Sequence, residues 1–161
     1  MGAMEKEATN MRRMLRSDID AVISLEREIG GGLTAVSRRD LIITDPGGPL
    51  DFSFVYEVGG KIVGFVLARL EYLGIPFVPI CCISGVGVKR EYQRQSIGSQ
   101  LINKVLDLCY SEGISKARAF LDEDNAEIKI FAKELGFKPS NIINYDIDFE
   151  YTGAKPSTRQ W

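Results

Sequence analysis

The chain has 161 residues, of which 45% are hydrophobic and 26% are charged. This length and composition are typical of one globular domain with a single core. The net charge of −2 gives no general attraction to nucleic acid or to an anionic membrane surface, so neither partner is expected. No apolar run reaches the roughly 20 residues that cross a bilayer, and the N-terminus lacks the apolar segment of a secretory signal. We therefore expect a cytoplasmic location.

The residue types present narrow the possible chemistry. The sequence contains no histidine, which excludes Ser-His-Asp and Cys-His nucleophile systems and removes the commonest zinc ligand, so no metal is expected. The three cysteines are odd in number in a chain without an export signal, and we expect free thiols. Any catalysis would use carboxylates, tyrosine, lysine, thiols, water or backbone groups.

The first part of the chain predicts a strand and two helices. Residues 11–15 form a short strand candidate. Ser17 and Asp18 then supply the capping chemistry of a helix that ends at the three glycines 30–32. A second helix is expected at 36–44, before a cluster of proline and glycine that breaks it.

Three consecutive strands follow. The stretches 52–58 and 61–73 are rich in β-branched and aromatic residues and are separated by Gly59-Gly60, which signals a two-residue hairpin turn. A further turn leads into a third strand at 77–88. We expect these strands to be antiparallel to one another.

Helices and strands alternate in the last part of the chain. Apolar residues recur at helical spacing over 97–111. A strand is expected at 115–123, a helix from Asn125 to Gly136, and a last strand at 142–150, where apolar and polar residues alternate.

This order of elements predicts one domain of the α/β (α+β) class over 11–151, with tails at 1–10 and 152–161. The sheet is expected to be mixed, mostly antiparallel and flanked by helices. A right-handed crossover makes the strands near 80–88 and 115–122 the one parallel pair. Open sheets bind ligands at the carboxyl ends of such strands.

The turn before the helix at 97–111 has the composition of an anion-binding loop. It reads QRQSIGS from residue 93 to residue 99. Backbone N–H groups at the positive end of a helix dipole can hold a phosphate. Gly98 would let the backbone approach it closely, and Arg94 could add positive charge. The alternative is an ordinary connection between a strand and a helix.

Three segments together resemble the GCN5-related N-acetyltransferase (GNAT) superfamily. The family's acyl-CoA motif has the form Gln/Arg-x-x-Gly-x-Gly/Ala, and Gln93 to Gly98 take its place, with Ser96 instead of the first glycine. Val86-Gly87-Val88 is similar to the family's bulged fourth strand. The segment from Asn125 to Phe137 is similar to its late helix. The resemblance implies the fold of that family, with an acyl-CoA cleft at the parallel pair.

The resemblance also implies a co-substrate and the residues that bind it. Acetyl-CoA would donate an acetyl group to the amine of a small molecule or peptide, and a homodimer is possible. The binding residues implied are Val86, Gly87, Val88, Gln93, Arg94, Gln95, Ser96, Ile97, Gly98, Ser99, Asn125 and Phe131. The N–H of Val88 would donate to the oxygen on which negative charge develops.

The catalytic acid and base of the family are missing at the matched positions. Many members place a tyrosine acid seven residues after the asparagine, where this chain has Ala132. Others place a glutamate base five residues before that asparagine or eleven before the motif, where this chain has Phe120 and Cys82. A catalytically weak or inactive acyl-CoA sensor is therefore the alternative function.

Three other residues are candidates for the general base. Asp122 shares a strand face with Phe120 if strand alternation continues that far. Glu71 lies at the end of a hairpin strand, and Tyr145 lies on the last expected strand. Each is also explained by an ordinary structural or solvated role.

Overall fold

The computed structural model of the chain describes residues 7–30 and 38–148. Five strands form one sheet in the order β1-β2-β3-β4-β5. They are β1 (Thr9–Arg13), β2 (Phe54–Val58), β3 (Lys61–Leu73), β4 (Val78–Val88) and β5 (Ala117–Ala119). Neighbouring strands are antiparallel except β4 and β5, which are parallel. The predicted mixed sheet with one parallel pair is confirmed.

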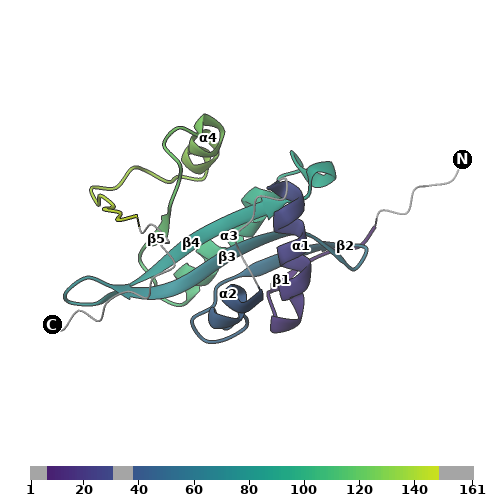
Figure 1. The fold of residues 1–161 in the computed structure, drawn as a ribbon, viewed down its shortest axis with the longest axis horizontal. Helices are drawn as coiled ribbons and strands as arrows, with labels where there is room; N and C mark the ends of the chain where they lie inside the picture. Colours follow the sequence, from purple (N-terminus) through teal and green to yellow (C-terminus); the bar gives the residue numbers. More distant parts are fainter. Residues whose placement is uncertain (1–6, 31–37, 149–161) are drawn as a thin grey trace, which may run out of the picture.

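Helices cover both faces of this sheet (Figure 1). One face carries α1 (Ile19–Ile29) and α2 (Arg38–Ile43), and the other carries α3 (Ile97–Ser111). The last helix, α4 (Ala126–Glu134), stands beyond β5, away from the centre of the sheet. Two short 3-10 turns, η1 (Arg16–Asp18) and η2 (Arg90–Tyr92), precede α1 and follow β4. None of the described helices is long and apolar enough to cross a membrane.

The sheet separates two apolar cores, one against each helical layer. On the α3 face, Leu101 and Val105 are fully buried against the strands. Gly64 of β3 allows this close contact, because a Cβ there would lie 3.1 Å from Cγ2 of Ile97. On the other face, Ile19 and its neighbours in α1 pack on Phe65.

The turn between β2 and β3 has the chemistry that the sequence predicts. Gly59 and Gly60 have φ values of 56° and 75°, which are both in the left-handed region that glycine adopts without steric cost. The hairpin interpretation is confirmed, and it fixes the register of β3 against β2.

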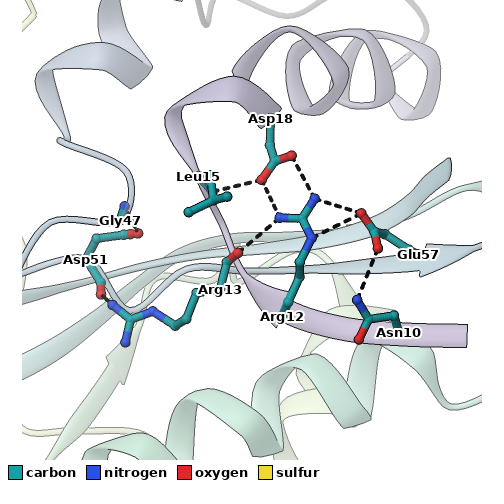
Figure 2. A network of polar contacts seen from close by, with 8 residues as sticks. All are labelled: Asn10, Arg12, Arg13, Leu15, Asp18, Gly47, Asp51 and Glu57. Atoms are coloured by element: carbon teal, nitrogen blue, oxygen red, sulfur yellow. Dashed lines mark hydrogen bonds and ion pairs between the residues drawn. The ribbon is translucent and has the colours of Figure 1, made fainter. Parts of the chain in front are cut away.

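A charged network joins β1, β2 and the start of α1 (Figure 2). The guanidinium of Arg12 donates to both carboxylate oxygens of Asp18 at 2.7 and 2.9 Å, and to Oε1 of Glu57 at 2.7 Å. Asp18 is buried and also accepts the N–H of Leu15 at 2.8 Å. These hydrogen bonds hold the pKa of Asp18 below its ordinary value and orient α1 over the sheet.

Two expectations for the end of the chain are wrong. The strand expected at 115–123 is short, since β5 ends at Ala119, so strand alternation does not reach Asp122. Residues 142–148 form no strand, and Ile143, Tyr145 and Ile147 are exposed. The alternating pattern is present there, but a three-residue β5 offers little edge for pairing. Some expectations lie outside the described residues; they are residues 1–6 of the first expected tail, all of the tail at 152–161, the start of the second helix (36–37) and residues 149–150 of the last strand.

Candidate active site

A β-bulge in β4 lies where its pairing with β5 ends, and we call the unpaired edge of β4 beyond this point the gap. Pairing between these strands ends with Ile83 opposite Ala119. The next residue of β4, Ser84, has no partner of its own on β3, because Ala68 pairs with Ile83 and Leu67 pairs with Gly85. Bulges bend the strand that carries the extra residue. The bulged residue of β4 therefore directly follows the last pair that β4 makes with β5.

The gap receives backbone donors from the far end of β4. The N–H of Lys89 donates to the carbonyl of Val63 at 2.8 Å, so this opposed pair is a hydrogen-bonded one. In an antiparallel ladder, hydrogen-bonded and non-hydrogen-bonded pairs alternate. The N–H groups of Val88 and Val86 therefore point away from β3, toward the side on which β5 has ended. This orientation fits the donor role predicted for Val88.

The loop before α3 has the backbone of an anion cradle. Arg94 and Ser96 have φ values of 59° and 63°, in the left-handed region, and such conformations turn successive N–H groups toward one concave side. The carbonyl of Ser96 accepts the N–H of Gln100 at 2.9 Å as α3 begins. The preceding N–H groups of 97–99 have no acceptor within the helix. They lie at the positive end of its dipole.

Two glutamines of the predicted motif hold this loop in place. Nε2 of Gln93 donates to the carbonyl of Val88 at 2.9 Å, and Nε2 of Gln95 donates to the carbonyl of Glu91 at 3.3 Å. Both side chains thus bind backbone of the segment that leaves β4. The N–H of Gln93 is also used within the loop, since it donates to the carbonyl of Arg90 at 3.2 Å.

Side chains from three elements meet beside the cradle. A Cβ on Gly98 would lie 3.5 Å from Cζ of Phe131 in α4 and 3.9 Å from Cγ2 of Val88. These are ordinary contact distances, so the approach of α4 to α3 depends on a small residue at 98. Asn125 caps α4, since its Oδ1 accepts the N–H of Ile128 at 3.2 Å. The predicted binding residues of β4, α3 and α4 are therefore brought to one end of the sheet.

A cavity of about 260 Å³ lies on the opposite side of β4, beneath α1. Apolar side chains form most of its wall; they are Val22, Ile23, Ile29, Leu41, Phe65 and Leu67. The backbone from Ser84 to Gly87 forms another part. Gly87 is small for packing reasons, because a Cβ there would lie 2.8 Å from the ring of Phe65 and 2.9 Å from Ile29. We name this cavity the α1 pocket.

Sequence reasoning missed one residue of this pocket. Glu26 is the one carboxylate among the described residues that line it. It lies four residues after Val22 and three before Ile29, on the apolar stripe of α1. An acidic residue at that spacing interrupts an otherwise buried face. This interruption is the sequence feature that could have identified Glu26.

The three base candidates lie in different surroundings. Glu71 is on β3 and, by alternation from Leu67, on the sheet face that carries the α1 pocket. Asp122 accepts the N–H of Asp124 at 3.0 Å in the loop before α4 and is exposed. Tyr145 is 92% exposed. Glu71 is thus the one candidate placed by a strand on the pocket side.

The positions of the missing acid and base are occupied by small or apolar groups. Ala132 is buried in α4, and Phe120 is exposed beyond the end of β5. Cys82 is buried, and its pKa is raised by burial and by the nearby carboxylate of Glu71. The described residues contain no cluster of three or more His, Cys, Asp or Glu side chains suited to a metal ion.

The site thus combines a parallel strand pair that ends early with a helix N-terminus beside it, and this is a place where open α/β sheets bind anionic ligands. Residues 22–137 of the sequence match the acetyltransferase (GNAT) family. The chain belongs to this family. The resemblance to this family is therefore confirmed.

Individual relatives agree with this assignment. An uncharacterized N-acetyltransferase of Methanocaldococcus jannaschii is 29% identical over 94 residues, which are 58% of this chain and 42% of the relative. The match thus spans less than half the length of that relative.

Solved structures share the fold at low sequence identity. The aminoglycoside N-acetyltransferase AAC(6')-Iy in complex with CoA superimposes with a TM-score of 0.76 at 15% identity, over 91% of this chain and 99% of that one. A possible acetyltransferase from Clostridium difficile 630 gives a TM-score of 0.73 at 19% identity, over 90% and 100%.

Proposed function

We propose that the protein is an N-acetyltransferase that moves an acetyl group from acetyl-CoA to an amine. The observation that carries this proposal is the outward orientation of the Val86 and Val88 N–H groups at the gap after the Ser84 bulge. Family membership and a neighbouring structure that contains CoA support the same conclusion.

The cradle would hold the pyrophosphate of the co-substrate. The N–H groups of 94–99 are the donors, and the dipole of α3 favours negative charge at this point. The N–H of Val88 would donate to the thioester carbonyl oxygen, where negative charge develops during attack. Gly98 and Phe131 would border the cofactor on the α4 side, because their contact closes this end of the cleft.

The reaction needs few groups from the protein. The amine nitrogen attacks the acetyl carbonyl carbon, the carbon–sulfur bond breaks, and the sulfur leaves with its electron pair as the CoA thiolate. The amine proton passes to a base, directly or through water. We assign this role to Glu71, which lies beside Cys82, the position of a family glutamate. Glu71 is opposite Ile80, eight residues before Val88 on β4, so the proton would reach it through a chain of waters and not directly.

Two measurements test the proposal. Calorimetry should show binding of acetyl-CoA, and release of free CoA thiol should depend on added amine. Glu71→Gln should lower kcat about 10²-fold or more, the contribution typical of a general base, and leave acetyl-CoA affinity unchanged. A chain that binds acetyl-CoA but releases no CoA with any amine would instead be the sensor module.

A further inference from the structure

We propose that residues 142–148 of one copy of the chain pair as a strand with the outer edge of β5 in a second copy, and that the exchange is reciprocal. This interface is independent of the proposed acetyl transfer. Three features of the single chain carry the inference: an open sheet edge, a segment with the side-chain pattern of a strand, and complementary charges on the two.

The outer edge of β5 has backbone groups that can pair with another strand. The N–H of Cys81 donates to the carbonyl of Lys116 at 3.0 Å, so the backbone groups of Lys116 point toward β4. Successive residues of a strand direct their N–H and C=O groups to opposite edges. Those of Ala117 and Ala119 therefore point outward, and no described strand lies beyond β5. Such an edge is a template for pairing with another chain.

Residues 142–148 have the pattern of a strand that lacks a partner. Apolar and polar side chains alternate there, and one face consists of Ile143, Tyr145 and Ile147. These three side chains are 74%, 92% and 75% exposed. Contiguous apolar surface that is left exposed on a chain marks an interaction site. The segment therefore has an apolar face that the described part of its own chain does not cover.

The segment and the edge match face by face. Ala117 and Ala119 pack against the core on the α3 side, and a strand paired with β5 would place its apolar face on that side. Its polar face, with Asp146 and Asp148, would then share the opposite side with Arg118. No ion pair joins Arg118 to another described residue, and opposite charges on neighbouring strands are favourable. A shift of one residue would reverse both matches.

A second copy supplies what one chain lacks. β5 has three residues, so a single pairing makes few hydrogen bonds, whereas exchange about a twofold axis makes the pairing twice in one interface. The exposed apolar side chains of each copy on the segment and directly after β5 are Phe120, Leu121, Ile142, Ile143, Tyr145 and Ile147. At roughly 100 Å² each, they amount to on the order of 600 Å², which approaches the roughly 800 Å² per partner of a standard interface.

The oligomeric state tests the interface. Gel filtration with light scattering at micromolar concentration should give the unaltered protein twice the 17.9 kDa mass of one chain. Ile143→Lys places a charge in the apolar face and should weaken the dimer at least tenfold. Ile43→Lys is the matched control, because Ile43 is 69% exposed and lies on α2; it should leave the mass unchanged. A single-chain mass for the unaltered protein, or a dimer unaffected by Ile143→Lys, would overturn the proposal.

Crosslinking distinguishes exchange between copies from pairing within one chain. Ala119→Cys is combined with Ile143→Cys, Tyr145→Cys or Ile147→Cys, so that the three pairs sample the possible registers. The native cysteines are buried, and Ala119→Cys alone is the control for random bridges. After mild oxidation, a non-reducing gel should show linked dimers for one of the pairs. A bridge within single chains would overturn the exchange, and absence of a bridge in all three pairs would overturn the pairing with β5.

Discussion

Ser96 shows how one side chain can keep a motif's geometry at a cost in stability. Its φ of 63° is a conformation that costs an L-residue about 1–2 kcal/mol, and the family has glycine at this position. Ser96→Gly should raise the free energy of unfolding by about 0.5 kcal/mol, after allowance for the entropy of glycine in the unfolded chain.

Chemical denaturation of the ligand-free protein checks this prediction. The control is Ser99→Gly, three residues later inside α3, which should destabilise by about 0.5–1 kcal/mol. If both substitutions raise the free energy of unfolding, or both lower it, the explanation from the backbone conformation of Ser96 is contradicted.

Gly98 offers a second prediction at the scale of one residue. Because a Cβ fits at 3.5 Å from Phe131, Gly98→Ala should fold normally, whereas the branches of Gly98→Val press on Phe131 and Val88. We expect Gly98→Val to weaken acetyl-CoA binding by at least about 2 kcal/mol. Arg94→Ala should cost less, since the backbone donors remain. Calorimetry with all three variants is the measurement, and unchanged affinity in Gly98→Val would remove this residue from the site.

Among the secondary-structure elements, β4 has the largest influence on the site. Its bulge adds Ser84 without changing the pairs on either side, Ala68 with Ile83 and Leu67 with Gly85. Deletion of Ser84 should therefore keep the β3–β4 register and straighten the strand. The gap to β5 should narrow, and acetyl-CoA affinity should fall at least tenfold.

Ser84→Ala is the matched control for this deletion, because it keeps the extra residue and removes the hydroxyl alone. It should bind acetyl-CoA like the unaltered chain. Thermal unfolding of both variants confirms that they fold. A deletion variant of full affinity would show that the gap does not depend on the bulge.

Most helices and strands can be predicted from the sequence, whereas fewer of the contacts between them can. The bounds of α3 agree with the expected 97–111, because its apolar spacing and Gly113 after its end are local signals. The strand expected at 142–150 has the same quality of pattern and does not form in its described part. Its failure depends on how early β5 ends, which no local pattern records.

The candidate site, too, is only partly predictable from the sequence. The anion loop is readable because its chemistry lies within seven consecutive residues. Glu26 is 60 residues from Val86 in sequence, and only the packing of α1 on β4 joins them. The orientation of the Val88 N–H depends on the register with β3, which is also a property of the folded chain.

For the whole molecule, the network of Arg12, Asp18 and Glu57 couples folding to pH. The pKa of Asp18 is lowered in the folded protein, so its stabilisation is fully present above its unfolded value of about 3.9 and is lost as the pH falls through the folded pKa. Asp18→Asn should lower stability at pH 7 by about 2 kcal/mol, and the difference should shrink below pH 4.

Urea titrations at several pH values measure this effect. Asp20→Asn, an exposed site two residues later, is the control and should change stability by less than about 0.5 kcal/mol. A constant difference between Asp18→Asn and the unaltered chain down to pH 2 would contradict the linkage.

The burial of all three cysteines has a practical consequence for kinetics. Cys81 and Cys82 of β4 and Cys109 of α3 are each less than 7% exposed, and the hydrogen bond that the Cys81 thiol donates to Cys109, together with burial, raises the pKa of Cys81. The thiolate is the reactive form, so an aromatic disulfide reagent should count released CoA with little background from the folded enzyme. The rate at which these buried cysteines do react would measure how often α3 separates from β4. Bound acetyl-CoA should lower that rate.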